Sequence, residues 1–186
     1  IYTLSLHDAL PILISKVKSL EEIVEIIKEL KKQGKTIVTT NGAFDLIHVG
    51  HVRNLEFCKK QGDVLIVGLN SDSSIKQYKS EKRPIIPQDQ RAEVISGLES
   101  VDYIFIFNET FPIPFLEKIK PDVHVKGSEY VRKLPETEIV EKNGGKIVFR
   151  PIPKDEPCTT KIIKKITETS GDNKWMLLMI LKKRKF

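Results

Sequence analysis

The stretch of sequence that decides the fold is Thr39-Thr40-Asn41-Gly42-Ala43-Phe44-Asp45-Leu46-Ile47-His48-Val49-Gly50-His51. The β-branched run at 36–40 predicts a strand that feeds a tight glycine turn. The turn delivers His48 and His51 to the start of the next helix, where residues three apart share one face. The free N–H groups of a helix start attract anions, and Gly42 and Gly50 let the backbone approach a ligand closely. The stretch therefore predicts a cradle for a polyphosphate.

The composition is that of one globular domain of ordinary size. The 186 residues are 40% hydrophobic and 30% charged. Of the net charge of +6, the last sixteen residues carry +4 and the first twelve carry −1, which leaves +3 between them. This charge suits an enzyme that handles phosphates and is too small to indicate nucleic acid. Cys58 and Cys158 are too few for a disulfide framework and lack metal-site spacing, which favours reduced thiols in a cytoplasmic protein.

Both ends of the chain look foreign to the domain between them. Residues 1–12 are interpreted as a translated sequencing-library adapter, so that His7 and Asp8 carry no function. Residues 13–170 are expected to form the functional domain. The tail 171–186 contains an apolar run that is too short to span a membrane. A frameshifted or read-through end is the favoured interpretation, with an interfacial membrane anchor as the alternative.

Periodicity and capping signals predict strands that alternate with helices. Ser19 and Glu22 form a capping box at the start of the first helix, and Gly34 ends it. The predicted strands cover 36–40, 63–70, 101–107, 122–126 and 146–151, and the later helices cover 51–60, 87–98, 115–119, 134–142 and 159–167. This alternation predicts an α/β fold: a Rossmann-like five-stranded parallel sheet with helices on both faces. Ligands in such sheets bind at the carboxyl ends of the strands.

A polar connector, 70–79, follows the second predicted strand and is interpreted as a loop. Lys76, Lys79 and Arg83 place three cations on this connector, which is useful for a second phosphate substrate beside a polyphosphate. Arg91 lies on the following helix, where a surface arginine is the plainer interpretation.

Two further segments come at ends of strands or starts of helices. Gly127 follows Lys126. It either allows main-chain N–H and C=O groups to hydrogen-bond to the flat edge of a nucleotide base, or forms a simple turn between strand and loop. Thr159 and Thr160, after Cys158, cap a helix start and there can also place hydroxyl and N–H groups on phosphate oxygens.

Two assignments stay open at this stage. Asp45 either caps a helix or turn, or holds the loop or a metal-bound phosphate in a nucleotide pocket. A zinc site built on His48 and His51, with His124 as a third ligand, is disfavoured because the chain offers no H-E-x-x-H glutamate and His124 lies in an apolar strand.

The run N-G-A-F-D-L-I-H-V-G-H resembles the HxGH motif of the nucleotidyltransferase superfamily that contains the cytidylyltransferases. From about residue 19 to 166 the chain resembles one branch, the heptose 1-phosphate adenylyltransferases. The resemblance is carried by Thr40-Asn41-Gly42, Phe44-Asp45, His48 to Arg53, Gly68 to Ser73, Arg83-Pro84, Gln90-Arg91, Val101-Asp102, Val125 to Gly127 and Thr159-Thr160. The segments 126–130 and 154–160 depart from the usual pattern of the branch.

The resemblance implies transfer of AMP from ATP to a sugar 1-phosphate, with Mg²⁺ accompanying the nucleotide. It also implies a sugar kinase, separate or fused, and is compatible with a homodimer. The expected catalytic residues are His48, His51 and Lys76. The expected nucleotide-binding residues are Asn41, Gly42, Ala43, Phe44, Asp45, His48, Gly50, His51, Lys126, Gly127, Cys158, Thr159 and Thr160. The expected residues for the acceptor phosphate are Asn70, Asp72, Lys76, Lys79, Arg83 and Arg91. No protein ligand is assigned to the metal.

Two other functions compete with this one. A related enzyme, such as a glycerol-3-phosphate cytidylyltransferase, differs in the nucleotide or the phosphate that it uses. A nucleotide-binding module without turnover belongs to another class, and it requires the basic tail to be genuine.

Overall fold

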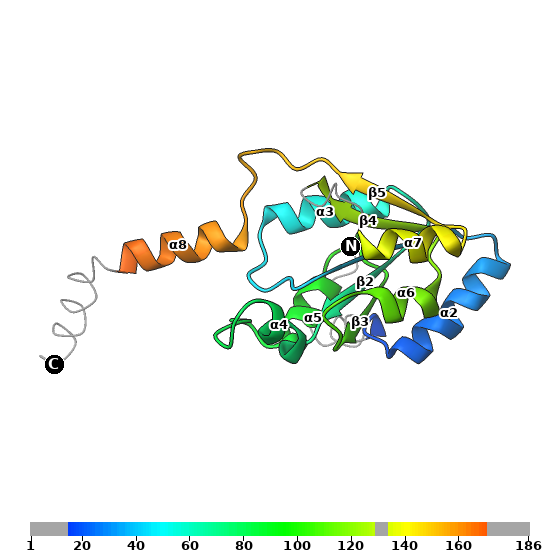
Figure 1. Cartoon of the computed structure of the whole chain (residues 1–186), viewed down its shortest axis with the longest axis horizontal. Helices are drawn as coiled ribbons and strands as arrows, with labels where there is room; N and C mark the ends of the chain where they lie inside the picture. Colours follow the sequence, from blue (N-terminus) through cyan, green and yellow to red (C-terminus); the bar gives the residue numbers. More distant parts are fainter. Residues whose placement is uncertain (1–14, 129–133, 171–186) are drawn as a thin grey trace, which may run out of the picture.

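Five parallel strands form one sheet at the centre of the structure, a computed structural model that describes residues 15–128 and 134–170 (Figure 1). Their order is β3-β2-β1-β4-β5, and every neighbouring pair is parallel. The strands are β1 (Ile37–Gly42), β2 (Val64–Asn70), β3 (Tyr103–Phe107), β4 (Val123–Gly127) and β5 (Lys146–Arg150). The predicted fold class is thus confirmed, and β1 is the central strand.

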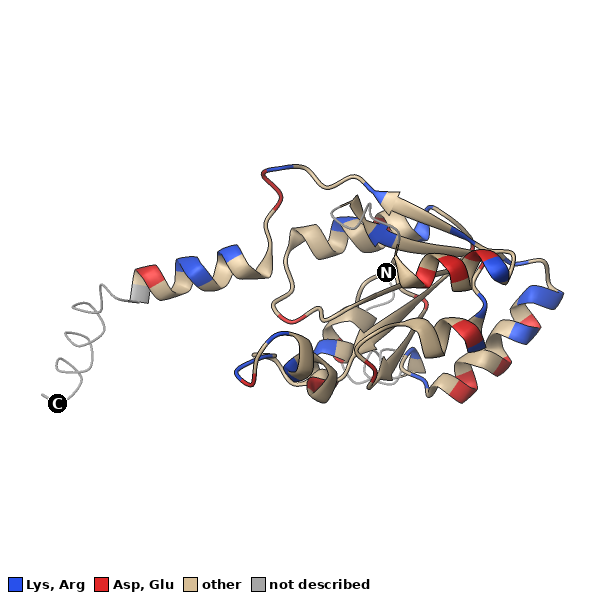
Figure 2. Cartoon of the chain, viewed as in Figure 1, with Lys and Arg blue, Asp and Glu red and all other residues tan. Residues whose placement is uncertain are grey.

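Helices cover both faces of this sheet, because its strands are apolar on both sides. All seven residues of β2 are buried. On one face α3 (Val49–Lys59) and α5 (Gln88–Ser96) contribute Leu55, Cys58, Ala92 and Ile95 to the core. On the other face the core includes residues of α2 (Leu20–Lys32), α6 (Ile113–Ile119) and α7 (Pro135–Lys142). The outer surface of α2 carries charges of both signs (Figure 2).

The first helix begins and ends as its sequence predicts. The Ser19 hydroxyl accepts a hydrogen bond from the Glu22 N–H at 3.1 Å, and the Glu22 carboxylate accepts one from the Ser19 N–H at 2.8 Å. Gly34, just beyond the helix, adopts φ +73°, a left-handed conformation that favours glycine. The predicted capping box is therefore confirmed.

The segment after β2 differs from the prediction. It was expected to be a loop, but α4 (Asp72–Tyr78) forms there, with the Ser71 hydroxyl accepting a hydrogen bond from the Ser74 N–H. The polar serines that suggested a loop act as the helix cap and as tertiary hydrogen-bonding groups. The prediction of a loop was wrong because short polar sequences can be held helical by tertiary contacts.

Three boundaries of strands and helices near the candidate site also differ from the predicted ones. β1 continues through Asn41 and Gly42, which are in register with Gly68 and Leu69 of β2. The following helix, α3, begins at Val49 rather than at residue 51. The last helix, α8 (Thr159–Ser170), runs three residues past its predicted end and projects away from the sheet (Figure 1).

Two interpretations made from the sequence fall outside the described residues: the adapter at 1–12 and the tail at 171–186. Within the described ranges, no helix is both long enough and apolar enough to cross a membrane.

Candidate functional site

A cavity of about 760 Å³ opens at the carboxyl ends of the strands. Asn41 and Gly42 close β1, Asn70 closes β2, Gly127 closes β4 and Arg150 closes β5, and all five residues line the cavity. Residues from the loop after β3 also line it. The carboxyl ends of parallel strands are the usual ligand-binding edge of an open α/β sheet, so the cavity lies where the sequence predicts it.

The two histidines of the deciding stretch lie together on one wall of this cavity. His48 is the N-cap of α3, and its Nδ1 accepts a hydrogen bond from the Gly50 N–H at 3.1 Å. The Nδ1 of His51 accepts one from the His48 N–H at 3.3 Å. The two rings stack with their centroids 3.9 Å apart. Each histidine therefore caps the helix start with one ring nitrogen.

These hydrogen bonds determine where the protons are. A neutral imidazole carries one proton, and a nitrogen that accepts a hydrogen bond cannot hold it. Since Nδ1 accepts in both rings, Nε2 carries the proton and is the donor in both. The neutral form is favoured: burial, with smaller contributions from His48 and Lys79, lowers the pKa of His51 to about 4, and burial also lowers the pKa of His48. The pair can thus offer two N–H donors without a positive charge.

A side chain would fit only tightly at two glycine positions beside these rings. A Cβ at Gly50 would lie 3.0 Å from the His48 ring and 3.1 Å from the carbonyl oxygen of Pro157. A Cβ at Gly42 would lie 3.1 Å from the ring of Phe44. Phe44 itself adopts φ +44°, uncommon for a residue with a side chain, and its ring packs 5.2 Å from that of His51. The glycines make room for the ring cluster that fixes the histidines.

Asp45 makes structural contacts between two loops, and the nucleotide contact that was one of its two predicted roles stays a prediction. Its side chain is fully buried, and its Oδ2 pairs with the Arg83 guanidinium at 2.5 Å. Its Oδ1 accepts hydrogen bonds from the N–H groups of Ile85 and Ile86 at 2.8 and 2.9 Å. Neither Asp45 nor Arg83 is among the described residues that line the cavity. The pair ties the loop before α5 to the turn after β1.

Arg91 makes a second tie between the same parts of the chain. Its guanidinium donates to the carbonyl oxygens of Ala43 and Ile86 and pairs with Asp72 at 2.7 Å. Arg91 is almost fully buried, and neither it nor Asp72 is found among the described cavity-lining residues. Asp72, Arg83 and Arg91 were predicted to bind the acceptor phosphate, and in the structure they make contacts within the protein. Their binding to a phosphate stays a prediction.

Of the two lysines at the end of α4, one lines the cavity. Both lysines are exposed, but Lys79, the C-cap of the helix, lines the cavity, whereas Lys76 is not among the described residues that line it. Burial, followed by the nearby Arg83, lowers the pKa of Lys79. The structure thus brings Lys79, and not Lys76, to the site predicted for both.

A buried polar chain lines the cavity at β4. Lys126 donates from Nζ to the Asn41 Oδ1 at 3.0 Å and pairs with Glu136 of α7 at 2.8 Å. Because the Asn41 oxygen faces the lysine, its amide NH₂ is left as a donor at the centre of the cavity. The sequence predicted Lys126 and Asn41 but missed Glu136, whose signal was its place at the start of a helix that follows a strand end.

The wall formed by β5 and the start of α8 also contains a buried pair. Arg150 donates two hydrogen bonds to the Glu156 carboxylate, at 2.9 and 2.6 Å, and this pairing lowers the pKa of Glu156. Cys158, Thr159 and Thr160 follow and line the cavity as predicted. The Arg150–Glu156 pair was missed, because residues six apart in a loop show no sequence pattern.

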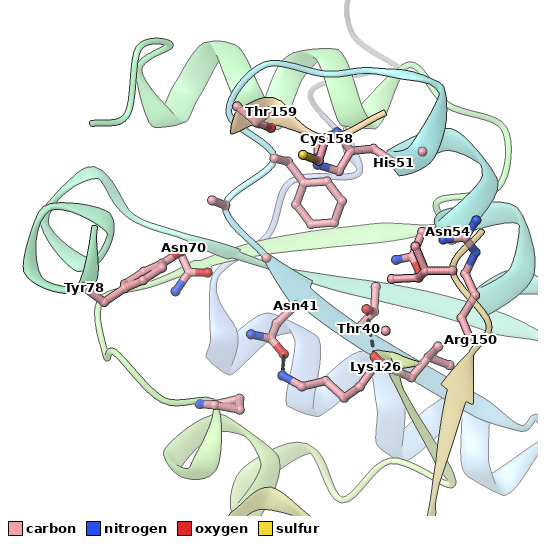
Figure 3. A pocket seen from close by; sticks show the side chains of 18 of the residues that line it. Thr40, Asn41, His51, Asn54, Asn70, Tyr78, Lys126, Arg150, Cys158 and Thr159 are labelled. Atoms are coloured by element: carbon pink, nitrogen blue, oxygen red, sulfur yellow. Dashed lines mark hydrogen bonds between the residues drawn. The ribbon is translucent and has the colours of Figure 1, made fainter. Parts of the chain in front are cut away.

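Asn41 stands between two ends of the cavity (Figure 3). Asn70 and Tyr78 lie on one side of it, and Lys126 and Arg150 lie on the other. His51 lies near Cys158 and Thr159. The lining residues that the sequence did not single out come from several loops and helices and from the end of β5: Asn54, Tyr78, Thr110, Phe111, Pro112, Leu134, Pro135, Glu136, Arg150, Ile152, Glu156 and Pro157.

A zinc site is not assembled by the histidines. His124 is fully buried, and its Nδ1 is 2.8 Å from the Thr39 hydroxyl oxygen. His124 is not among the described residues around the cavity that holds His48 and His51. Across the described residues there is no group of three or more His, Cys, Asp or Glu side chains that could hold a metal ion. The disfavoured zinc alternative therefore has no set of ligands in the described ranges.

The sequence matches a known protein family and several curated relatives. A family model described as cytidylyltransferase-like matches residues 39–166. Curated relatives include the bifunctional protein HldE of Geobacter sulfurreducens, 43% identical over 159 residues, and that of Campylobacter concisus, 46% identical over 159 residues. These alignments cover 85% and 86% of this chain but 32% of each relative. The chain thus spans about a third of the length of the curated relatives that it matches.

Two solved structures are also similar to this chain. A lipopolysaccharide core biosynthesis protein from Thermoplasma volcanium is 30% identical with a TM-score of 0.53, covering 66% of this chain and 99% of that one. A pantoate-β-alanine ligase from Francisella tularensis has a TM-score of 0.56 at 18% identity, covering 75% of this chain and 67% of that one, and shows a shared fold.

Proposed function

Because the chain belongs to the cytidylyltransferase-like family, we propose that it transfers AMP from ATP to a sugar 1-phosphate, heptose 1-phosphate, and releases pyrophosphate. The observation that carries the proposal is the histidine pair, whose two Nε2 donors stand on one wall of a cavity at the end of the central strand. The likeness to a lipopolysaccharide core biosynthesis protein supports a sugar phosphate as the acceptor.

The reaction requires little acid–base chemistry from the protein. An oxygen of the acceptor phosphate attacks the α-phosphorus of ATP and forms a new P–O bond. The bond from the α-phosphorus to the α–β bridging oxygen breaks, and its electron pair leaves with pyrophosphate. Since the attacking oxygen is already anionic, no proton has to be removed from it. The protein mainly aligns two anions and stabilises negative charge.

The proposed reaction assigns a part of the two substrates to each group of cavity residues. The Nε2–H groups of His48 and His51, with the N-terminus of α3, donate to triphosphate oxygens where charge develops. Lys79 binds the acceptor phosphate from the opposite side. Val125 and Gly127 line the end of the cavity that is suited to the base, as the turn after β4 predicts.

Magnesium fits the site as a companion of the nucleotide. The carboxylates that line the cavity, Glu136 and Glu156, are paired with Lys126 and Arg150. Mg²⁺ commonly binds through substrate phosphates and water, with few protein ligands. We therefore propose that it neutralises phosphate oxygens of ATP and that no protein carboxylate is needed to hold it.

The relatives suggest a second domain as well. Their name calls them bifunctional, and about two thirds of their length lies outside the matched region. We propose that a sugar kinase, fused or separate, supplies the sugar 1-phosphate that this domain uses.

The test is pyrophosphate release, measured with ATP or CTP and with a panel of acceptors that contains several sugar 1-phosphates and glycerol 3-phosphate. Release with ATP and heptose 1-phosphate at the highest kcat/KM is the expected result. Release with CTP and glycerol 3-phosphate alone would instead establish the related cytidylyltransferase. Nucleotide binding in calorimetry, with no release for any acceptor, would leave the chain as a non-catalytic nucleotide-binding module.

A further inference from the structure

At the β2 end of the cavity, we infer that Tyr78 and Phe111 form a platform for the sugar ring of the acceptor. The inference rests on the proposed function, since it names the part of the same site that recognises the acceptor. The two rings come from different elements: Tyr78 is the last residue of α4, and Phe111 lies in the loop between β3 and α6. Both line the cavity.

Both aromatic rings are unusually open to solvent for residues of their size. Tyr78 is 42% exposed and Phe111 is 60% exposed. The other phenylalanine of the cavity, Phe44, is by contrast buried against His51. Large apolar groups that stay exposed inside a pocket are the usual means of gripping an apolar ligand face.

The loop that carries Phe111 is held in place. The Thr110 hydroxyl donates to the Gln77 Oε1 of α4 at 3.0 Å, and the Ser74 hydroxyl donates to the Glu109 carbonyl oxygen at 2.9 Å. Asn70 in turn donates to the Ser74 hydroxyl oxygen at 3.0 Å. The loop after β3 is therefore tied to the helix that carries Tyr78, so that both aromatic residues are positioned by one hydrogen-bonded network.

The polar groups around the platform match a sugar phosphate. The Lys79 Nζ lies over the Tyr78 ring, 5.7 Å from its centroid, which places a cation for the phosphate at one face of this ring. Thr110 and Asn70 also line this end, and their side-chain oxygens can accept hydrogen bonds from sugar hydroxyls. A sugar ring has an apolar C–H face and a polar edge, and these suit an aromatic surface rimmed by such groups.

The opposite end of the cavity is different. Its charged groups are paired with each other, as Lys126 with Glu136 and Arg150 with Glu156, and Ile152 supplies an apolar surface. That environment suits a neutral base, whereas the end with Lys79 suits an anion. The sugar phosphate is therefore assigned to the β2 end, with its phosphate turned toward the histidine pair.

The test uses the variants Tyr78→Ala and Phe111→Ala in the full chain, with pyrophosphate release as the assay. Each is expected to raise the KM for heptose 1-phosphate roughly tenfold and to leave the KM for ATP within about twofold. Inhibition by inorganic phosphate, which contacts only the charged groups, is expected to stay unchanged. Tyr78→Phe and Phe111→Tyr keep a ring and should retain nearly the original KM.

A matched control is Val94→Ala. Val94 is 49% exposed on α5 and is not among the described cavity-lining residues, so that its truncation should change neither KM. An unchanged KM for the sugar phosphate in both alanine variants would overturn the inference and leave the proposed function standing. A raised KM for ATP instead would overturn it too, by placing the base on the platform. If the unmodified chain releases no pyrophosphate with any sugar 1-phosphate, both the function and the platform are rejected.

Discussion

At the scale of single residues, the position of one proton decides what each histidine can do. His48 and His51 use Nδ1 to accept backbone hydrogen bonds, so that Nε2–H is left to donate. Asparagine places a polar atom near the position of Nδ1, and glutamine places one near that of Nε2. Substitution at His51 can therefore separate its capping role from its donor role.

We expect His51→Asn to keep the helix cap but lose the distal donor. Turnover should fall by ~10²–10³, the usual cost of losing one donor to developing charge, while the melting temperature changes little. His51→Gln, which keeps a donor near Nε2, should recover part of the rate. The turnover of His51→Ala should fall about as far as that of His51→Asn. Pyrophosphate release and thermal melts measure these effects, and near-normal turnover of His51→Asn would exclude the donor role.

The two lysines of α4 offer a matched pair for the acceptor phosphate. Both are exposed, but Lys79 lines the cavity and Lys76 is not among the described residues that line it. A charge-assisted hydrogen bond contributes about 1.5–3 kcal/mol, so Lys79→Ala should raise the KM for the sugar 1-phosphate roughly 10- to 100-fold. Lys76→Ala should leave it within about twofold. Equal effects of the two substitutions in steady-state kinetics would contradict this placement of the phosphate.

At the scale of elements, α4 and α5 are joined to the turn after β1 by buried polar ties. Arg91 contacts Ala43, Ile86 and Asp72, and Asp45 contacts Arg83 and the loop before α5. These ties connect the segment that carries the histidines to the helix that carries Lys79. The distance between the two phosphate-binding groups is therefore set by side chains that do not line the cavity.

Arg91→Met should consequently destabilise the fold and also impair the site. It leaves two carbonyl oxygens and the Asp72 carboxylate without their partner, which costs about 3 kcal/mol in the free energy of unfolding. Urea unfolding measures this cost. Arg53→Met, at an exposed arginine of α3, is the control and should cost far less. A fully stable Arg91→Met variant that had lost its affinity for the sugar phosphate would instead indicate direct contact with the acceptor.

At the scale of the whole molecule, three histidines couple stability to pH. Burial lowers the pKa of His48, brings that of His51 to about 4, and holds that of His124 well below 6.5. A base whose pKa is lower in the folded state is protonated first in the unfolded state. The stability that depends on its neutral form is complete above pH 6.5 and is lost as the pH falls below that value.

The melting temperature should therefore decrease between pH 6.5 and pH 4.5, above the range in which most carboxylates are protonated. The double variant His51→Asn, His124→Asn should show a smaller decrease over this interval, because two of the three groups no longer titrate. Differential scanning calorimetry in buffers of matched ionic strength measures the slope. Parallel slopes for the two proteins would show that other groups cause the dependence.

The sequence by itself determined the five parallel strands of the sheet and the cradle, whereas the central place of β1 came from the structure. Continuous apolar runs such as 64–67, the capping box at Ser19 and the run from Asn41 to His51 are local signals, and local physics is enough to read them. They predicted the five parallel strands and most of the segments that line the cavity. They also led to the family in which the chain is now placed.

Only the tertiary structure decided which charged side chains reach the cavity. Arg83 and Arg91 were predicted to bind a phosphate, and Asp45 was left with either a structural or a nucleotide-binding role. In the structure all three form pairs between loops and helices, while Lys79 and Glu136 line the site. The sequence shows that a side chain is charged but not which partner lies opposite to it. Because a buried charge must be paired, that partner, set by contacts between segments distant in the chain, determines whether the charge serves the fold or the ligand.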